Sequence, residues 1–128
     1  MKKISILVPC YNEEQVLPLF IQSITPLMDN TKYEWELLLI DDGSTDKTLS
    51  IMQQAHQQVD HIHYLELSRN FGKENALMAG LDYVSGDAVV IMDADLQHPV
   101  SVIPKLIEKW EEGYDDVYAH RLSRGKEN

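Results

Sequence analysis

Asp93 and Asp95 are the residues best suited to catalysis or metal binding, because they place two carboxylates, with one residue between them, directly after an apolar run. That run, AVVIM at 88–92, has the composition of a buried strand. Residues two apart in an extended backbone point the same way, so both carboxylates can reach one point. A divalent cation would remove their repulsion, and the amide of Gln97 adds an oxygen suited to Mg²⁺ or Mn²⁺. Such a cation would attract a diphosphate.

The same two aspartates also have a plainer interpretation. An Asp-x-Asp pair occurs often by chance, and acids at the start of a loop often cap a helix. The placement of the pair favours the metal interpretation, because polar segments follow three other apolar runs in the chain. These segments are PCYNEE at 9–14, DDGSTD at 41–46 and SRNFGKEN at 68–75.

Each candidate residue in these segments has two interpretations. Asp41 and Asp42 belong to a turn and helix cap, or they supply a carboxylate that accepts hydrogen bonds from a nucleobase or ribose. Tyr11 is half-buried packing, or an aromatic face against a base. Arg69 and Lys73 pair with surface acids, or they meet phosphate oxygens beside the acidic pair.

The chain alternates between strand-like and helical patterns, which predicts a parallel sheet with helices on both faces. Apolar runs predict strands at 3–9, 34–40, 63–67, 88–92 and, as a short fifth one, 116–119. Helical spacing predicts helices at 17–29, 46–58, 73–84 and 100–112, the second capped by Ser44 or Thr45. Right-handed crossovers make this a Rossmann-like, doubly wound α/β domain, in which ligands bind beyond the carboxyl ends of the strands. We therefore expect the four polar segments to lie together.

Length and composition limit the function classes. The 128 residues, 44% of them hydrophobic, suffice for one compact domain. A formal charge of −10 argues against nucleic-acid binding and against an anchor on anionic lipid. The lone Cys10 excludes a disulfide within the chain and fits a reducing compartment; we expect it to act as a small apolar residue. The sequence shows no signal-peptide pattern, bilayer-spanning run, dinucleotide-binding glycine motif or P-loop.

Three stretches, taken together, resemble family two of the glycosyltransferases. They are ISILVPCYNEE, LLIDDGSTDKT and LSRNFGKENALMAGLDYVSGDAVVIMDADLQHP, and they stand in the family's order. The resemblance runs from residue 3 to about 124 and is greatest to the polyprenol-phosphate sugar transferases. An Asp-x-Asp alone is a weak signal, whereas all four polar segments in order are specific. The resemblance implies the type-A nucleotide-diphospho-sugar transferase fold, here truncated.

The resemblance also implies roles for individual residues. Asp93 and Asp95 would be catalytic and, with Gln97, would hold Mg²⁺ or Mn²⁺. Arg121 and Arg124 fall where the polyprenol-phosphate subgroup carries arginines near the acceptor phosphate. The residues expected to bind the nucleotide-sugar, with Asp41 and Asp42 at its base or ribose, are Pro9, Tyr11, Glu13, Asp41, Asp42, Lys73, Asp93 and Ala94.

These assignments predict a metal-dependent, inverting hexosyltransferase that uses a UDP- or GDP-sugar and a polyprenyl phosphate acceptor. The alternatives are a family-two transferase acting on a saccharide hydroxyl, a sugar nucleotidyltransferase and a receiver-like signalling module. We interpret residues 1–128 as the nucleotide-sugar-binding part of a longer catalytic domain, without its acceptor half and any membrane helices. The longer protein is expected at the cytoplasmic face of a membrane, with contact through parts absent here, and a homo-oligomer is left open.

Overall fold

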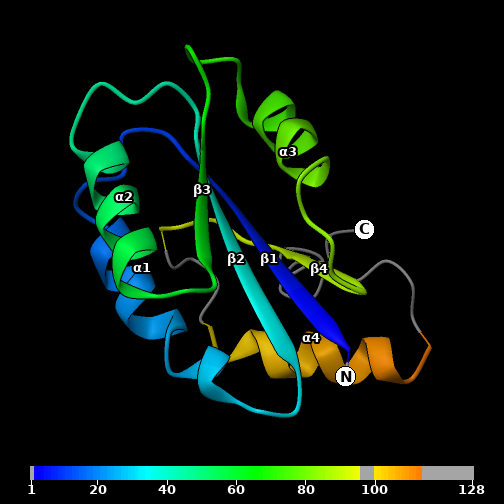
Figure 1. Cartoon of the computed structure of the whole chain (residues 1–128). Helices are drawn as coiled ribbons and strands as arrows, with labels where there is room; N and C mark the ends of the chain where they lie inside the picture. The colour runs from blue at the N-terminus through cyan, green and yellow to red at the C-terminus, as the bar shows by residue number, and fades with distance from the viewer. Residues whose placement is uncertain (1, 96–99, 114–128) are drawn as a thin grey trace.

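Residues 2–95 and 100–113 of the chain are described by the computed structural model (Figure 1). Within these ranges the centre of the molecule is a parallel sheet with the strand order β3-β2-β1-β4. Its strands are β1 (Lys3–Cys10), β2 (Glu34–Asp41), β3 (Ile62–Glu66) and β4 (Ala88–Ile91). The first four predicted strands are therefore confirmed to within one residue at each end, and the predicted fifth at 116–119 lies outside the described residues.

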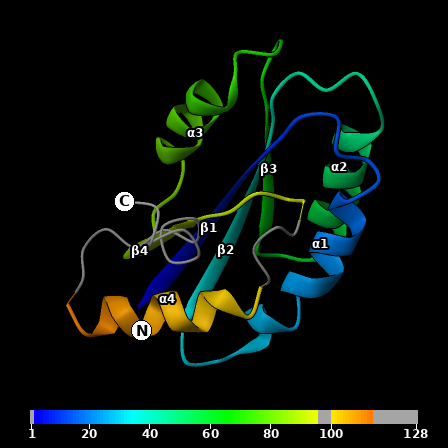
Figure 2. The same cartoon turned by 180° about the vertical axis from the view of Figure 1, so that it is seen from behind.

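Helices cover both faces of the sheet, as a doubly wound domain requires (Figures 1 and 2). One face packs against α1, α2 and α4, and the buried side chains of these helices and of the strands together form the main core. The other face packs against α3 through a smaller cluster that includes Leu38, Ile40 and Ala76. The bounds are α1 (Leu17–Ile24), a 3₁₀ turn η1 (Leu27–Asp29), α2 (Thr48–Gln58), α3 (Lys73–Leu81) and α4 (Val102–Glu111).

The continuous apolar runs of β1 and β2 follow from burial on both faces. Ile6 and Leu37 join the main core, whereas their chain neighbours Leu7 and Leu38 join the cluster under α3. Burying one such side chain contributes about 1.5–3 kcal/mol to stability. The two central strands thus form a rigid base for the loops that follow them.

All four predicted helices are present, but each differs from the prediction at one end or both: α3 ends at Leu81 instead of residue 84, and α4 spans 102–111 instead of 100–112. The first helix ends at Ile24 instead of residue 29, because Pro26 cannot donate a backbone hydrogen bond inside a helix and begins the separate turn η1. The second helix begins at Thr48, and its first N–H donates to Asp46 Oδ1 at 2.9 Å. The predicted caps were therefore wrong: Ser44 Oγ accepts instead from the backbone N–H of Asn12.

A polar cluster on β1 and β2 fixes the turn that leads into β4. Glu36 Oε1 accepts from Ser5 Oγ at 2.6 Å and from the Ser85 N–H at 2.8 Å, while Lys3 Nζ lies 3.1 Å from Glu36 Oε2. Ser5 Oγ also accepts from the Gly86 N–H at 2.8 Å. Burial alone would raise the pKa of Glu36, but these hydrogen bonds and the Lys3 charge lower it overall. The cluster therefore favours the ionised carboxylate.

Glu36→Gln is expected to lower the free energy of unfolding by about 1–3 kcal/mol at neutral pH, because Ser85 N–H and Lys3 lose a charged acceptor. Because the pKa of Glu36 is lowered in the folded protein, this stabilisation is fully present above the usual pKa range of glutamate and is lost as pH falls below that range, through the lowered pKa. Urea unfolding of both proteins between about pH 3 and 7 measures the difference. A gap that stays constant over this range would contradict the account.

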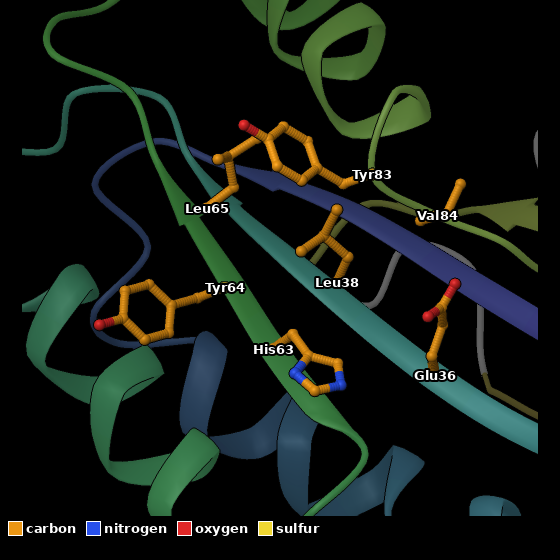
Figure 3. A pocket seen from close by; sticks show the side chains of 7 residues that line it. All are labelled: Glu36, Leu38, His63, Tyr64, Leu65, Tyr83 and Val84. Carbon is orange, nitrogen blue, oxygen red and sulfur yellow. The ribbon is translucent and has the colours of Figure 1, made fainter.

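A cavity of about 340 Å³ lies over β2 and β3, beside the chain that follows α3 (Figure 3). Figure 3 shows Leu38 and Leu65 on its floor, Tyr83 across from them, and Tyr64 turned the other way, toward α2. Among the described residues, none from the four polar segments after the strands lines this cavity. The candidate site is therefore elsewhere.

Candidate functional site

The carboxyl ends of all four strands meet around a cavity of about 290 Å³. In Figure 1, β1, β2 and β3 run side by side toward this edge of the sheet. The parallel register pairs Cys10 with Asp41 and Leu7 with Ile91, so Asp93 follows β4 at about the level of Pro9. The predicted gathering of polar strand ends is thus observed. The lining residues are Pro9, Cys10, Tyr11, Glu13, Asp42, Asn70, Gly72, Lys73 and Asp93.

An ion pair spans this cavity. Lys73, the first residue of α3, places its Nζ 2.6 Å from Asp93 Oδ1. Both side chains remain partly accessible, with 58% of Lys73 and 31% of Asp93 exposed. Such an exposed pair adds little to stability. The pair does place an ammonium and a carboxylate on the wall of a cavity, where each can break the ion pair and contact a ligand instead.

Carboxylates concentrate negative charge beside this pair. Burial raises the pKa of the Glu13 carboxyl, and the negative charges of Asp95 and Asp93 raise that pKa further. The charges of both members of the Asp-x-Asp pair therefore act on Glu13, which lines the cavity. A bound cation would offset this repulsion.

These acids fit a hard divalent cation that takes some of its ligands from elsewhere. Within the described ranges, no group of three or more His, Cys, Asp and Glu side chains is arranged to hold a metal by itself. Mg²⁺ sites commonly use one or two carboxylates together with water and substrate phosphates, and Asp93 and Asp95 offer such a pair. Gln97, the predicted third ligand, lies outside the described residues.

Asp41 and Asp42 are buried, with 2% and 3% of their surfaces exposed. Asp41 Oδ1 accepts from the Ser44 N–H at 3.1 Å, which confirms the turn. Asp42 accepts from the Phe71 N–H at 2.8 Å and the Gly72 N–H at 3.0 Å. The carboxylates thus already have backbone partners. Their predicted contact with a base or ribose remains a prediction.

The β1–α1 loop is tied to the loop before α2. Asn12, which has a φ of 52°, accepts from the Thr45 N–H at 2.8 Å, and the Glu13 N–H donates to Thr48 Oγ1 at 2.8 Å. These bonds hold Tyr11 at the rim of the cavity with 46% of its surface exposed. A side chain that is about half exposed fits both interpretations, so its contact with a base remains a prediction.

Cys10 and Ala94 have buried side chains. Burial raises the pKa of the Cys10 thiol well above its usual range, and the nearby charges of Glu13, Asp41 and Asp93 raise it further. The thiol therefore stays protonated and unreactive, which confirms the expected small apolar residue. Ala94 packs in the main core, so only its backbone can meet a ligand.

Asn70 and Gly72 line the cavity but were not predicted as site residues. The signal that could have found them is their position in SRNFGKEN between the two candidate cations. Arg69 itself does not line the cavity; its guanidinium stacks on the Phe71 ring at 4.9 Å. The predicted acceptor-phosphate residues Arg121 and Arg124 lie outside the described residues.

Residues 5–128 match the sequence profile of the family described as Glycosyl transferase family 2. The chain belongs to this family. It is 44% identical over 125 residues to an undecaprenyl-phosphate 4-deoxy-4-formamido-L-arabinose transferase of Salmonella choleraesuis, covering 97% of this chain and 38% of that protein. It is 48% identical over 122 residues to a bactoprenol glucosyl transferase of Shigella phage SfV, covering 95% of this chain and 40% of that protein. The family member thus spans well under half the length of these relatives.

Solved structures agree with this family membership and with the type-A glycosyltransferase fold predicted from the sequence. The mannosyltransferase PcManGT from Pyrobaculum calidifontis, solved in complex with GDP-Man and Mn²⁺, aligns with a TM-score of 0.67 and 27% identity. The alignment covers 85% of this chain and 32% of that one. In the part of this chain that the structure describes, no helix is both long and apolar enough to cross a membrane.

Proposed function

We propose that residues 1–128 are the donor-binding part of a metal-dependent, inverting hexosyltransferase. The observation that supports this most is the cavity where Lys73 and Asp93 pair at the carboxyl ends of the strands. A diphosphate needs cations, and an acidic chain must supply them locally. Lys73 is one, and the acidic pair recruits the other.

The donor is a UDP- or GDP-sugar whose diphosphate lies between Lys73 and the acidic pair. Tyr11 at the rim offers an aromatic face for the base. Asp93, Asp95 and Gln97 would hold Mg²⁺ or Mn²⁺, which when bound stabilises negative charge on the diphosphate. The presence of GDP-Man and Mn²⁺ in the similar mannosyltransferase structure supports this donor class.

The acceptor we propose is a polyprenyl phosphate, because undecaprenyl phosphate appears in the name of a relative 44% identical to this chain. One oxygen of that phosphate attacks the anomeric carbon as the bond from that carbon to the diphosphate breaks. The nucleoside diphosphate leaves with the electron pair, and the anomeric centre inverts. An ionised phosphate needs positioning more than a strong general base. We assign that positioning to Arg121 and Arg124.

The complete protein on this proposal works at the cytoplasmic face of a membrane, where a polyprenyl phosphate presents its head group. Membrane contact would come through segments beyond the acidic part described here. The donor site needs no second copy of the chain, because every residue proposed for it comes from one chain, and a homo-oligomer is left open.

Calorimetric titration with UDP, GDP and their hexose conjugates, with and without Mn²⁺, tests the proposal. We expect one nucleotide to bind, and to bind more tightly with Mn²⁺, because the acidic pair repels a diphosphate until a cation is present. The same titration on the longer protein removes any effect of the absent acceptor half. Failure to bind either nucleotide in both proteins would overturn the function.

A further inference from the structure

The segment that precedes Lys73, residues 69–72, is held in place by Asp42. The Asp42 carboxylate accepts from the Phe71 N–H through Oδ1, and from the Gly72 N–H and Asn70 Nδ2 through Oδ2, at 2.8, 3.0 and 3.2 Å. Asn70 Nδ2 also lies 3.2 Å from the Asp42 backbone oxygen. A buried carboxylate is stable only when hydrogen-bond donors replace water. Here those donors all come from one segment.

Gly43 holds the same segment by a different means. Its φ is +73°, and a Cβ built on it would lie 2.3 Å from both the Arg69 carbonyl carbon and the Asn70 nitrogen. These are backbone atoms, so no rotamer change could relieve the contact. The backbone of residues 69–70 therefore packs directly on Gly43, in space that only glycine leaves open. Hydrogen bonding and close packing thus act on one segment from neighbouring residues.

The held segment leads directly into α3 and the ion pair. Gly72, with a φ of +97°, is the residue before α3, and Lys73 is its first residue. Figure 1 shows the chain passing from β3 through this connection into α3. The Lys73 backbone is therefore fixed one residue beyond the last hydrogen bond to Asp42. Its Nζ reaches Asp93 from that position.

We propose that Asp42 and Gly43 form a clamp on residues 69–72 that positions Lys73 at the donor diphosphate. Asp42 is then a positioning residue that acts on the diphosphate through Lys73, and this inference rests on the proposed function. Asparagine at this position keeps one acceptor oxygen but turns its NH₂ group toward either the Phe71 N–H or the Gly72 N–H, so one of these donors loses its acceptor. The clamp should open although the side chain keeps its size.

Hydrogen exchange tests the clamp without any ligand. In the wild-type chain the amides of Phe71 and Gly72 should be protected, and in Asp42→Asn and Gly43→Ala their exchange should be faster by about tenfold or more. Gly113→Ala is the control, because that glycine has a φ of +105° but a Cβ would meet nothing within 4 Å. Wild-type amides that exchange as fast as those of an exposed loop would overturn the clamp without any variant.

Nucleotide titration then tests what the clamp does. UDP and GDP should each be compared with uridine and guanosine in the wild type, Asp42→Asn, Gly43→Ala, Lys73→Met and the Gly43→Ala/Lys73→Met double variant. We expect Gly43→Ala, which keeps both carboxylates, to weaken diphosphate binding by about tenfold, to leave nucleoside binding unchanged, and to add nothing to Lys73→Met. Asp42→Asn should lose at least as much diphosphate affinity, and a loss of nucleoside affinity in that variant alone would report the predicted contact of Asp42 with the base or ribose.

The outcomes separate two kinds of failure. If Gly43→Ala weakens uridine or guanosine as much as the diphosphate, and its effect multiplies with that of Lys73→Met, the clamp does not act through Lys73 and the positioning role is overturned. If the wild type and the longer protein bind neither nucleotide, the proposed function fails, whatever the exchange shows. Unchanged exchange at Phe71 and Gly72 in both clamp variants overturns the clamp alone.

Discussion

Replacing Asp93 with asparagine should abolish metal-dependent binding of nucleoside diphosphates and lower sugar transfer by the longer enzyme by about a hundredfold or more. Asp93 lies on the cavity wall with its side chain partly exposed, so the change removes a charge without opening the core. The amide keeps the size of the carboxylate but binds Mg²⁺ or Mn²⁺ far more weakly. Calorimetric titration with Mn²⁺, alone and with the bound nucleotide, measures the loss. Asp95→Asn should act in the same direction.

Asp60→Asn is the matched control for the loss of one negative charge. Asp60 is exposed and precedes β3, at the edge of the sheet opposite the cavity. It should leave nucleotide and Mn²⁺ affinities unchanged, which separates a local ligand effect from the overall charge of −10. Asp93→Asn binding that keeps the wild-type dependence on Mn²⁺ would remove Asp93 from the metal site.

The cavity itself could be predicted from the sequence, because its position depends on strand order and not on side-chain detail. Apolar runs marked four strands, and parallel strands bring their carboxyl ends to one edge. The register then aligns Asp93 with Pro9 and the turn after β2. This is why residues from four separated segments line one space.

The partner of Asp42 could not be predicted, because its donors lie 28 to 30 residues further along the chain. DDGS is a common turn sequence, and nothing local shows that one carboxylate of the pair is already surrounded by N–H groups. The backbone of residues 69–70 lies against Gly43 only because β3 and its loop return beside β2. The partners of Asp42 and Gly43 therefore depend on tertiary contacts that the local sequence does not show.

Helix ends were predicted poorly for a related reason. Periodicity continued past Pro26, where the missing N–H ends α1. Three polar side chains stood before α2, and only the structure shows that Asp46 meets the Thr48 N–H while Ser44 accepts from Asn12. Which side chain caps the helix therefore depends on which of the others form hydrogen bonds with a neighbouring loop. The loop at Tyr11 and the start of α2 therefore form one unit.

Lys73→Met should change two affinities in opposite directions. The ammonium lies 2.6 Å from Asp93 Oδ1, so without a nucleotide it competes with any cation for that carboxylate. Removing it should tighten Mn²⁺ binding to the nucleotide-free protein by a few-fold, about the size of an exposed ion pair. It should weaken UDP or GDP binding by about 10–100-fold, because a charge-assisted hydrogen bond to phosphate is lost.

Calorimetry with Mn²⁺ and then with the nucleotide at saturating Mn²⁺ measures both effects. Lys105→Met, an exposed lysine on α4, is the control for loss of one positive charge and should alter neither affinity. Lys73→Arg keeps the charge and should lie between the wild type and Lys73→Met for the nucleotide, since the guanidinium fork does not reproduce the compact ammonium beside Asp93. If Lys73→Met weakened both affinities, the ion pair would be holding Asp93 in place for the metal. Opposite signs would establish that Lys73 occupies Asp93 until a cation takes its place and leaves the ammonium to the diphosphate.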